Sequence, residues 1–142
     1  MFKNIIKKID SNELSKDIYD SYYVEDYQCI DLHDVVEDCL ISIVKDKFNK
    51  EVEEVLKEQF NSQNTQTLND EEYEEELEYY IEENKFDFIC ENVKDIRLKI
   101  VESIEKMFDK DGYDCYCGEI FPYDGRFINN NCTHAFVKRD NN

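Results

Sequence analysis

The sequence predicts a mainly α-helical protein, a bundle of four or five helices followed by a small C-terminal β-hairpin. The first 111 of the 142 residues contain neither glycine nor proline, the residues that most strongly interrupt regular structure. All three glycines and the single proline lie from Gly112 onward. We therefore expect an acidic helical domain over 1–111 and a Cys/His-bearing hairpin tail over 112–142 that packs on it.

Apolar residues recur at helical spacing in the first half of the chain. Leu14, Ile18 and Tyr22 are four residues apart and follow Asp10 or Ser11, either of which can cap a helix. A longer apolar series predicts helix over residues 29–60, with a bend near residue 49. Its members are Cys29, Leu32, Val36, Cys39, Ile43, Phe48, Val52, Val55, Leu56 and Phe60.

Residues 61–69 are polar and aperiodic, which predicts an interhelical loop. Asn69 or Asp70 can cap the next helix, and the glutamates of its first turn suit the helix dipole. The spacing of apolar residues predicts this helix as far as Ile81 and a last helix over 89–108. Gly112 is placed to end the last helix, and with no internal repeat a helical bundle is the expected architecture.

The tail carries three of the six cysteines and one of the two histidines. Two short apolar segments, 119–121 and 126–128, flank a turn sequence at 122–125, which predicts a β-hairpin. An even number of loop residues places four side chains on one face, because side chains alternate along a strand. These are Cys115, Cys117, Cys132 and His134. A four-residue loop pairs Cys115 with Cys132, and a two-residue loop pairs it with His134.

Three thiols and one imidazole are a common ligand set for structural zinc, and a metal supplies folding energy that a short tail lacks. Reduced cysteines and a cross-strand disulfide remain as alternatives. The sequence shows no signal-peptide-like apolar run at its start and no membrane span, so we expect a cytoplasmic protein that does not bind membranes. In that compartment thiols and metal ligands are commoner than disulfides.

Catalytic motifs are missing from the sequence. The glycine-free first 111 residues cannot hold a glycine-rich phosphate loop, and there is no Gly-x-Ser-x-Gly or His-Glu-x2-His arrangement. We therefore expect a protein that is not an enzyme.

The charge is strongly negative, with 17 basic and 35 acidic residues and a net charge of −18. Such a charge argues against direct binding of nucleic acid and favours a partner with a basic surface. Nine of the fourteen residues at 70–83 are acidic and none is lysine or arginine. Like charges four apart destabilise a helix by roughly 0.2–0.5 kcal/mol per pair, so this segment is expected to use its charge for binding.

A second segment, 17–28, also interleaves tyrosines with carboxylates, and tyrosine is a preferred anchor of protein interfaces. In the 70–83 helix, Glu71, Glu75, Glu78 and Glu82 form one row. The predicted partner-binding residues are Asp17, Asp20, Tyr22, Tyr23, Glu25, Asp26, Asp70, Glu71, Glu72, Glu74, Glu75, Glu78, Tyr79 and Glu82.

In size, charge and Tyr/Asp/Glu content, residues 1–111 resemble the small acidic inhibitors of phages and mobile elements, the DNA-mimic anti-restriction and anti-CRISPR proteins. The resemblance implies a non-catalytic inhibitor that mimics nucleic acid and occupies the basic channel of a nuclease or of a CRISPR or restriction effector. The alternative function is a small zinc-stabilised adaptor whose acidic helix only solubilises it. A homodimer through the tyrosine-bearing faces is a further expected partnership.

Overall fold

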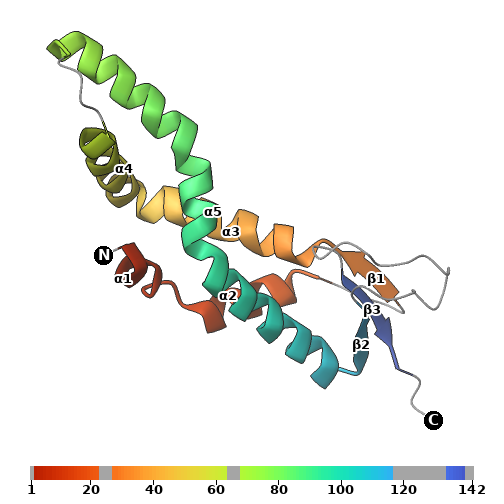
Figure 1. The fold of residues 1–142 in the computed structure, drawn as a ribbon. Helices are drawn as coiled ribbons and strands as arrows, with labels where there is room; N and C mark the ends of the chain where they lie inside the picture. Colours follow the sequence, from red (N-terminus) through yellow and green to blue (C-terminus); the bar gives the residue numbers. More distant parts are fainter. Residues whose placement is uncertain (1, 23–26, 64–67, 117–133, 140–142) are drawn as a thin grey trace. The chain divides into compact units, whose positions relative to one another are not determined.

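The computed structural model describes residues 2–22, 27–63, 68–116 and 134–139, and over these ranges the protein is mainly helical, as predicted (Figure 1). These ranges contain five helices and three short strands. In chain order they are α1 (Phe2–Ile6), α2 (Ser11–Asp20), β1 (Tyr27–Ile30), α3 (Leu32–Lys47), α4 (Asn49–Gln63), α5 (Asp70–Lys110), β2 (Tyr113–Tyr116) and β3 (His134–Lys138).

The predicted helix ends are confirmed at three positions. The Asp10 carboxylate accepts a hydrogen bond from the Glu13 amide at 3.0 Å and caps α2. Asn69 caps α5 in the same way, accepting from the Glu72 amide at 2.8 Å. Gly112 follows α5 with a φ of 97°, a left-handed conformation that glycine adopts without steric cost. The predicted bend near residue 49 is the break between α3 and α4.

Two elements differ from the prediction. Helix α5 is continuous from Asp70 to Lys110, where two helices were expected. No glycine or proline interrupts it, so nothing in the local sequence forces a break. Cys29 was expected on a helix but lies on strand β1, and it is exposed rather than in the core. A four-residue strand is stable only when paired, and β3, more than 100 residues away in sequence, supplies the partner.

The sheet has the order β1-β3-β2, and both pairings are antiparallel. The β2–β3 pairing confirms that the two ends of the predicted tail lie side by side. Both predicted registers were wrong, because Cys115 pairs with Phe136 rather than with Cys132 or His134. The predicted strands at 119–121 and 126–128 lie outside the described residues.

The chain divides into two compact units. The first contains residues 1–9 and 39–94, and the second contains residues 10–38 and 95–142, which include the predicted tail. In the first unit, side chains of α1, the C-terminal part of α3, α4 and α5 form a core, and the rings of Phe2 and Phe88 meet at 5.1 Å. Its buried side chains are Phe2, Ile6, Leu40, Ile41, Val44, Val52, Leu56, Phe60, Leu77, Ile89 and Val93.

In the second unit, the sheet and the C-terminal part of α5 share a core. Phe136 of β3 is fully buried and stacks on Phe108 of α5, with ring centroids 3.9 Å apart. Arg139, directly after β3, pairs with Asp109 at 3.1 Å and with Asp114 at 2.8 Å. Across the described ranges, no helix has an apolar stretch long enough to cross a bilayer.

Candidate functional site

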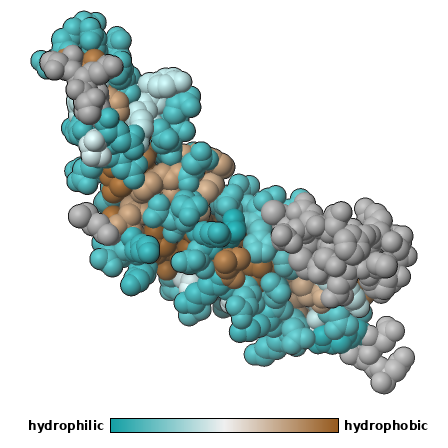
Figure 2. Space-filling model, in the orientation of Figure 1, coloured by the Kyte–Doolittle hydropathy of each residue, from teal (hydrophilic) through white to brown (hydrophobic). Residues whose placement is uncertain are grey.

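The acidic segment at 70–83 forms the first turns of α5, and most of its side chains are exposed. We call these residues the acidic surface: Asp70, Glu71, Glu72, Glu74, Glu75, Glu76, Glu78, Tyr79, Glu82 and Glu83. Within the part of the chain that the structure describes, no lysine or arginine forms an ion pair with any of these carboxylates. On the side drawn in Figure 2, hydrophilic residues cover most of this part of α5.

Helix α5 contacts α4 along one side only. Leu77 is buried, and the rings of Tyr73 and Tyr80 lie 5.7 and 5.5 Å from the ring of Phe60 on α4. The predicted row of Glu71, Glu75, Glu78 and Glu82 lies about 100–160° around the helix from Leu77, because successive residues of an α-helix rotate by about 100°. Packing against α4 therefore leaves this row open to solvent.

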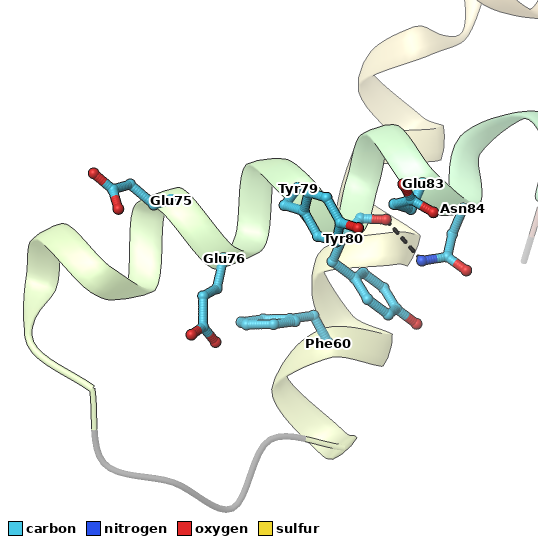
Figure 3. A pocket seen from close by; sticks show the side chains of 7 residues that line it. All are labelled: Phe60, Glu75, Glu76, Tyr79, Tyr80, Glu83 and Asn84. Carbon is cyan, nitrogen blue, oxygen red and sulfur yellow. Dashed lines mark hydrogen bonds between the residues drawn. The ribbon is translucent and has the colours of Figure 1, made fainter.

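A hollow of about 510 Å³ lies beside this contact, between α4 and α5 (Figure 3). Phe60 supplies the α4 side, and Tyr79 and Tyr80 supply aromatic surface from α5. Its other lining residues are Glu75, Glu76, Glu83 and Asn84. In Figure 3, Glu76 extends toward the side of Phe60, whereas Glu75 points away from it. Tyr79 is the most exposed large apolar side chain here, at 66 %.

A second hollow, of about 320 Å³, takes its lining from Glu53 of α4 and from Glu74, Leu77, Glu78, Ile81, Glu82 and Lys85 of α5. Lys85 donates hydrogen bonds to Asn49 at 2.8 Å and to Glu53 at 3.0 Å. The nearest cation in the sequence of α5 is therefore engaged with α4, and Glu74, Glu78 and Glu82 form no ion pair with any described lysine or arginine.

The second predicted partner-binding segment belongs to the other compact unit. Asp17 and Asp20 are exposed on α2 and Tyr22 is half-buried, while Tyr23, Glu25 and Asp26 lie outside the described residues. Tyr19, which was not predicted as a site residue, donates a hydrogen bond to Asp111. Partial burial, this bond and the Asp111 charge raise the pKa of the Tyr19 phenol above its ordinary value.

The tail contributes to a cluster of metal-ligand side chains that includes one residue the sequence analysis missed. Glu105 of α5, Cys115 of β2 and His134 of β3 have ligand atoms that all lie within 4.8 Å of one another. Cys115 and His134 share a face of the sheet, as the alternation of side chains predicted. The other two predicted ligands, Cys117 and Cys132, lie outside the described residues.

His134 is 3 % exposed, and its Nε2 lies 3.4 Å from Oε1 of Glu105. The ring of His33, on α3, lies 5.5 Å from the ring of His134. Burial lowers the pKa of His33, and the nearby His134 and Arg97 lower it further. Arg97 pairs with Glu37 at 2.7 Å, and both side chains are mostly shielded from solvent.

Glu105 carried no signal of this role in the sequence, since it is one of 35 acidic residues and lies ten positions before Cys115. Only the return of β2 and β3 beside α5 brings it to the other two ligands. Comparison with protein-family models, with curated proteins and with solved structures finds no match to the chain.

Proposed function

We propose that the protein is a non-catalytic interaction protein, an inhibitor whose acidic surface binds the basic nucleic-acid channel of a nuclease or of a CRISPR or restriction effector. One observation carries the proposal. The acidic surface is a helix face of exposed carboxylates that no described cation pairs with. A helix that only needs solubility gains from interleaved lysines, because opposite charges at i,i+4 stabilise it.

The aromatic lining of the larger hollow supports an interface role. Tyr79 is exposed next to Glu75, Glu76 and Glu83, so a basic side chain entering the hollow meets carboxylates and ring faces together. A guanidinium over an aromatic ring gains roughly 0.5–1 kcal/mol at an exposed site. The surface therefore suits lysine and arginine side chains that ordinarily contact phosphates.

Inhibition would follow from competition. Carboxylates along one helix face present negative charge to the same side chains that hold a phosphate backbone, so nucleic acid and inhibitor cannot be bound together. Electrostatic attraction accelerates association, and dissolved salt screens it. Binding should therefore weaken steeply as ionic strength rises.

The test is charge reversal of the exposed row. Wild-type protein and a Glu71→Lys, Glu75→Lys, Glu78→Lys, Glu82→Lys variant are used as baits in lysate of the native host. Any protein retained is then purified and its affinity for both baits is measured with and without competing DNA or RNA. We expect at least a hundredfold loss of affinity in the variant and displacement of wild type by nucleic acid.

A matched control separates the acidic surface from total charge. Glu54, Glu58, Asp87 and Glu91 are also exposed in the same compact unit, and reversing all four changes the net charge equally. This control variant should retain most of the affinity. An equal loss of affinity in both variants would contradict nucleic-acid mimicry. Binding that competing DNA or RNA does not weaken would contradict it as well.

A zinc-stabilised adaptor is the second candidate function, and the cluster of Glu105, Cys115 and His134 favours it. Thiolate and imidazole are preferred zinc ligands, and a structural zinc ion would stabilise a small sheet. In this alternative the acidic surface serves solubility. Metal analysis of protein purified without chelator tests it, and one equivalent of zinc per chain is the expected result.

A further inference from the structure

We infer that Glu105, Cys115 and His134 are the ligands of a zinc site that ties the sheet to helix α5. The inference rests on the zinc ion of the second candidate function and replaces the ligand set predicted from the sequence. The sequence predicted a site closed within the hairpin by Cys115, Cys117, Cys132 and His134. The structure assigns a carboxylate ligand from a helix instead.

The distances fit a metal ion. Zinc binds thiolate sulfur at about 2.3 Å and imidazole nitrogen or carboxylate oxygen at about 2.0–2.2 Å, so ligand atoms around a tetrahedral ion lie roughly 3.3–3.8 Å apart. Nε2 of His134 and Oε1 of Glu105 are already 3.4 Å apart. All three ligand atoms lie within 4.8 Å of one another, so a shift of about 1 Å at the thiol completes the geometry.

The burial of His134 is an independent observation. Its side chain is 3 % exposed, and within the described residues its Nδ1 atom is buried without a hydrogen-bond partner. An unsatisfied buried nitrogen costs about 1–3 kcal/mol. The separation from Glu105 also exceeds the usual 2.7–3.2 Å of an N–H···O hydrogen bond. A metal ion bound by Nε2 of His134 and Oε1 of Glu105 would supply this pair with a polar contact, while Nδ1 of His134 would keep no described partner.

The three ligands come from three different elements. Cys115 is on β2, His134 is on the adjacent β3, and Glu105 is on α5, which packs against the sheet through Phe108 and Phe136. The mixture of thiolate, imidazole and carboxylate ligands suits zinc better than magnesium or calcium, because those two ions prefer oxygen ligands alone. Zinc binding would therefore link β2 to β3 and both strands to α5.

X-ray absorption spectroscopy of the zinc-loaded wild type tests the ligand set without a mutation. We expect one sulfur neighbour at about 2.3 Å and otherwise nitrogen or oxygen neighbours. Three sulfur neighbours would show that the ligands are Cys115, Cys117, Cys132 and His134, as predicted from the sequence. That result would overturn the role of Glu105 but would still agree with a zinc-stabilised adaptor. No bound zinc would overturn both.

Cobalt(II) titration of variants tests the individual ligands. Glu105→Gln should weaken binding at least tenfold, because Glu105 is 38 % exposed and its replacement by an isosteric amide leaves the fold intact. Glu102→Gln, on the same helix and 69 % exposed, is the control that should bind normally.

Cys115→Ser should remove the thiolate-to-cobalt absorption band, and Cys29→Ser, an exposed cysteine of the same sheet, should retain it. Circular dichroism confirms that each variant is folded. Wild-type affinity in a folded Glu105→Gln protein would overturn the inference, as would an unchanged thiolate band in folded Cys115→Ser protein.

Discussion

The two ends of helix α5 differ in how their charged side chains are paired. Residues 70–83 contain nine acidic residues and no basic one, and none of these carboxylates pairs with a described cation. Residues 95–110 contain four acidic and four basic residues, and several of them pair with other elements. Arg97 binds Glu37 of α3, Glu105 approaches His134 of β3, and Asp109 binds Arg139. One helix therefore combines a region whose charges serve the fold with a region whose charges remain available to a partner.

The charges of α5 pair where other elements pack beside the helix, in shielded pairs such as Arg97 with Glu37 and in exposed pairs such as Asp109 with Arg139. The C-terminal end of α5 is covered by the sheet, where an unpaired charge would lose its hydration without compensation. Among the described residues, the N-terminal end packs on α4 along one side and its carboxylates are exposed, so they keep their water and tolerate mutual repulsion.

The largest expected effect is on the packed end. Phe136→Ala removes a fully buried ring that stacks on Phe108 and should lower the free energy of unfolding by about 3–5 kcal/mol. Denaturant unfolding measures this loss. Tyr79→Ala, which truncates an exposed ring of the acidic surface, should change stability by less than about 0.5 kcal/mol. Similar losses of unfolding free energy in both variants would contradict the difference proposed between the two ends of α5.

The next effect concerns the shielded ion pair. Arg97→Met leaves the mostly buried Glu37 without its partner at 2.7 Å and should cost about 1–3 kcal/mol. Lys106→Met is the matched control, since Lys106 and Glu102 are both largely exposed and such pairs contribute about 0–1 kcal/mol. Thermal unfolding of both variants compares them. A larger loss from Lys106→Met would show that burial does not decide which pairs stabilise this helix.

Tyr19→Phe tests a smaller contact in the same unit. The variant keeps the ring, which lies edge-on to Phe108 at 4.8 Å, and removes the hydrogen bond to Asp111, at a cost of about 0.5–1.5 kcal/mol. The folded protein raises the pKa of this phenol above its unfolded value near 10. The stabilisation is therefore present in full below about pH 10 and is lost as the pH rises above that value.

Unfolding free energies of wild type and Tyr19→Phe, measured between pH 8 and pH 11, should converge at the alkaline end. A constant difference across that range would mean that the phenol does not ionise differently in the folded protein.

The smallest effect has the opposite sign. Glu75→Lys creates a favourable pair with Glu71 one turn earlier, and should raise the free energy of unfolding by roughly 0.2–0.5 kcal/mol for each repulsive pair it relieves. The gain should disappear in high salt. The same variant should bind the partner less tightly. Loss of stability at low salt would show that the acidic surface is not under repulsion.

Several features could be predicted because they depend on neighbouring residues. Asp10 and Asn69 cap helices through amides three residues away, and Gly112 ends α5 through its own φ angle. The shared face of Cys115 and His134 followed from the alternation of side chains along strands. Strand β1 was missed because four residues have no strand preference strong enough to act alone, and its pairing partner lies at the other end of the chain.

The sequence by itself determined the helical class, the three confirmed helix ends and the concentration of negative charge at 70–83, because composition, spacing and capping act over a few residues. Only the tertiary structure decided which of those charges are paired, and it alone joined β1 to β3. It also brought Glu105 to Cys115 and His134, and it chose a register that neither predicted loop length had produced. These contacts join residues distant in sequence, as does the stacking of Phe136 on Phe108, so no local pattern encodes them.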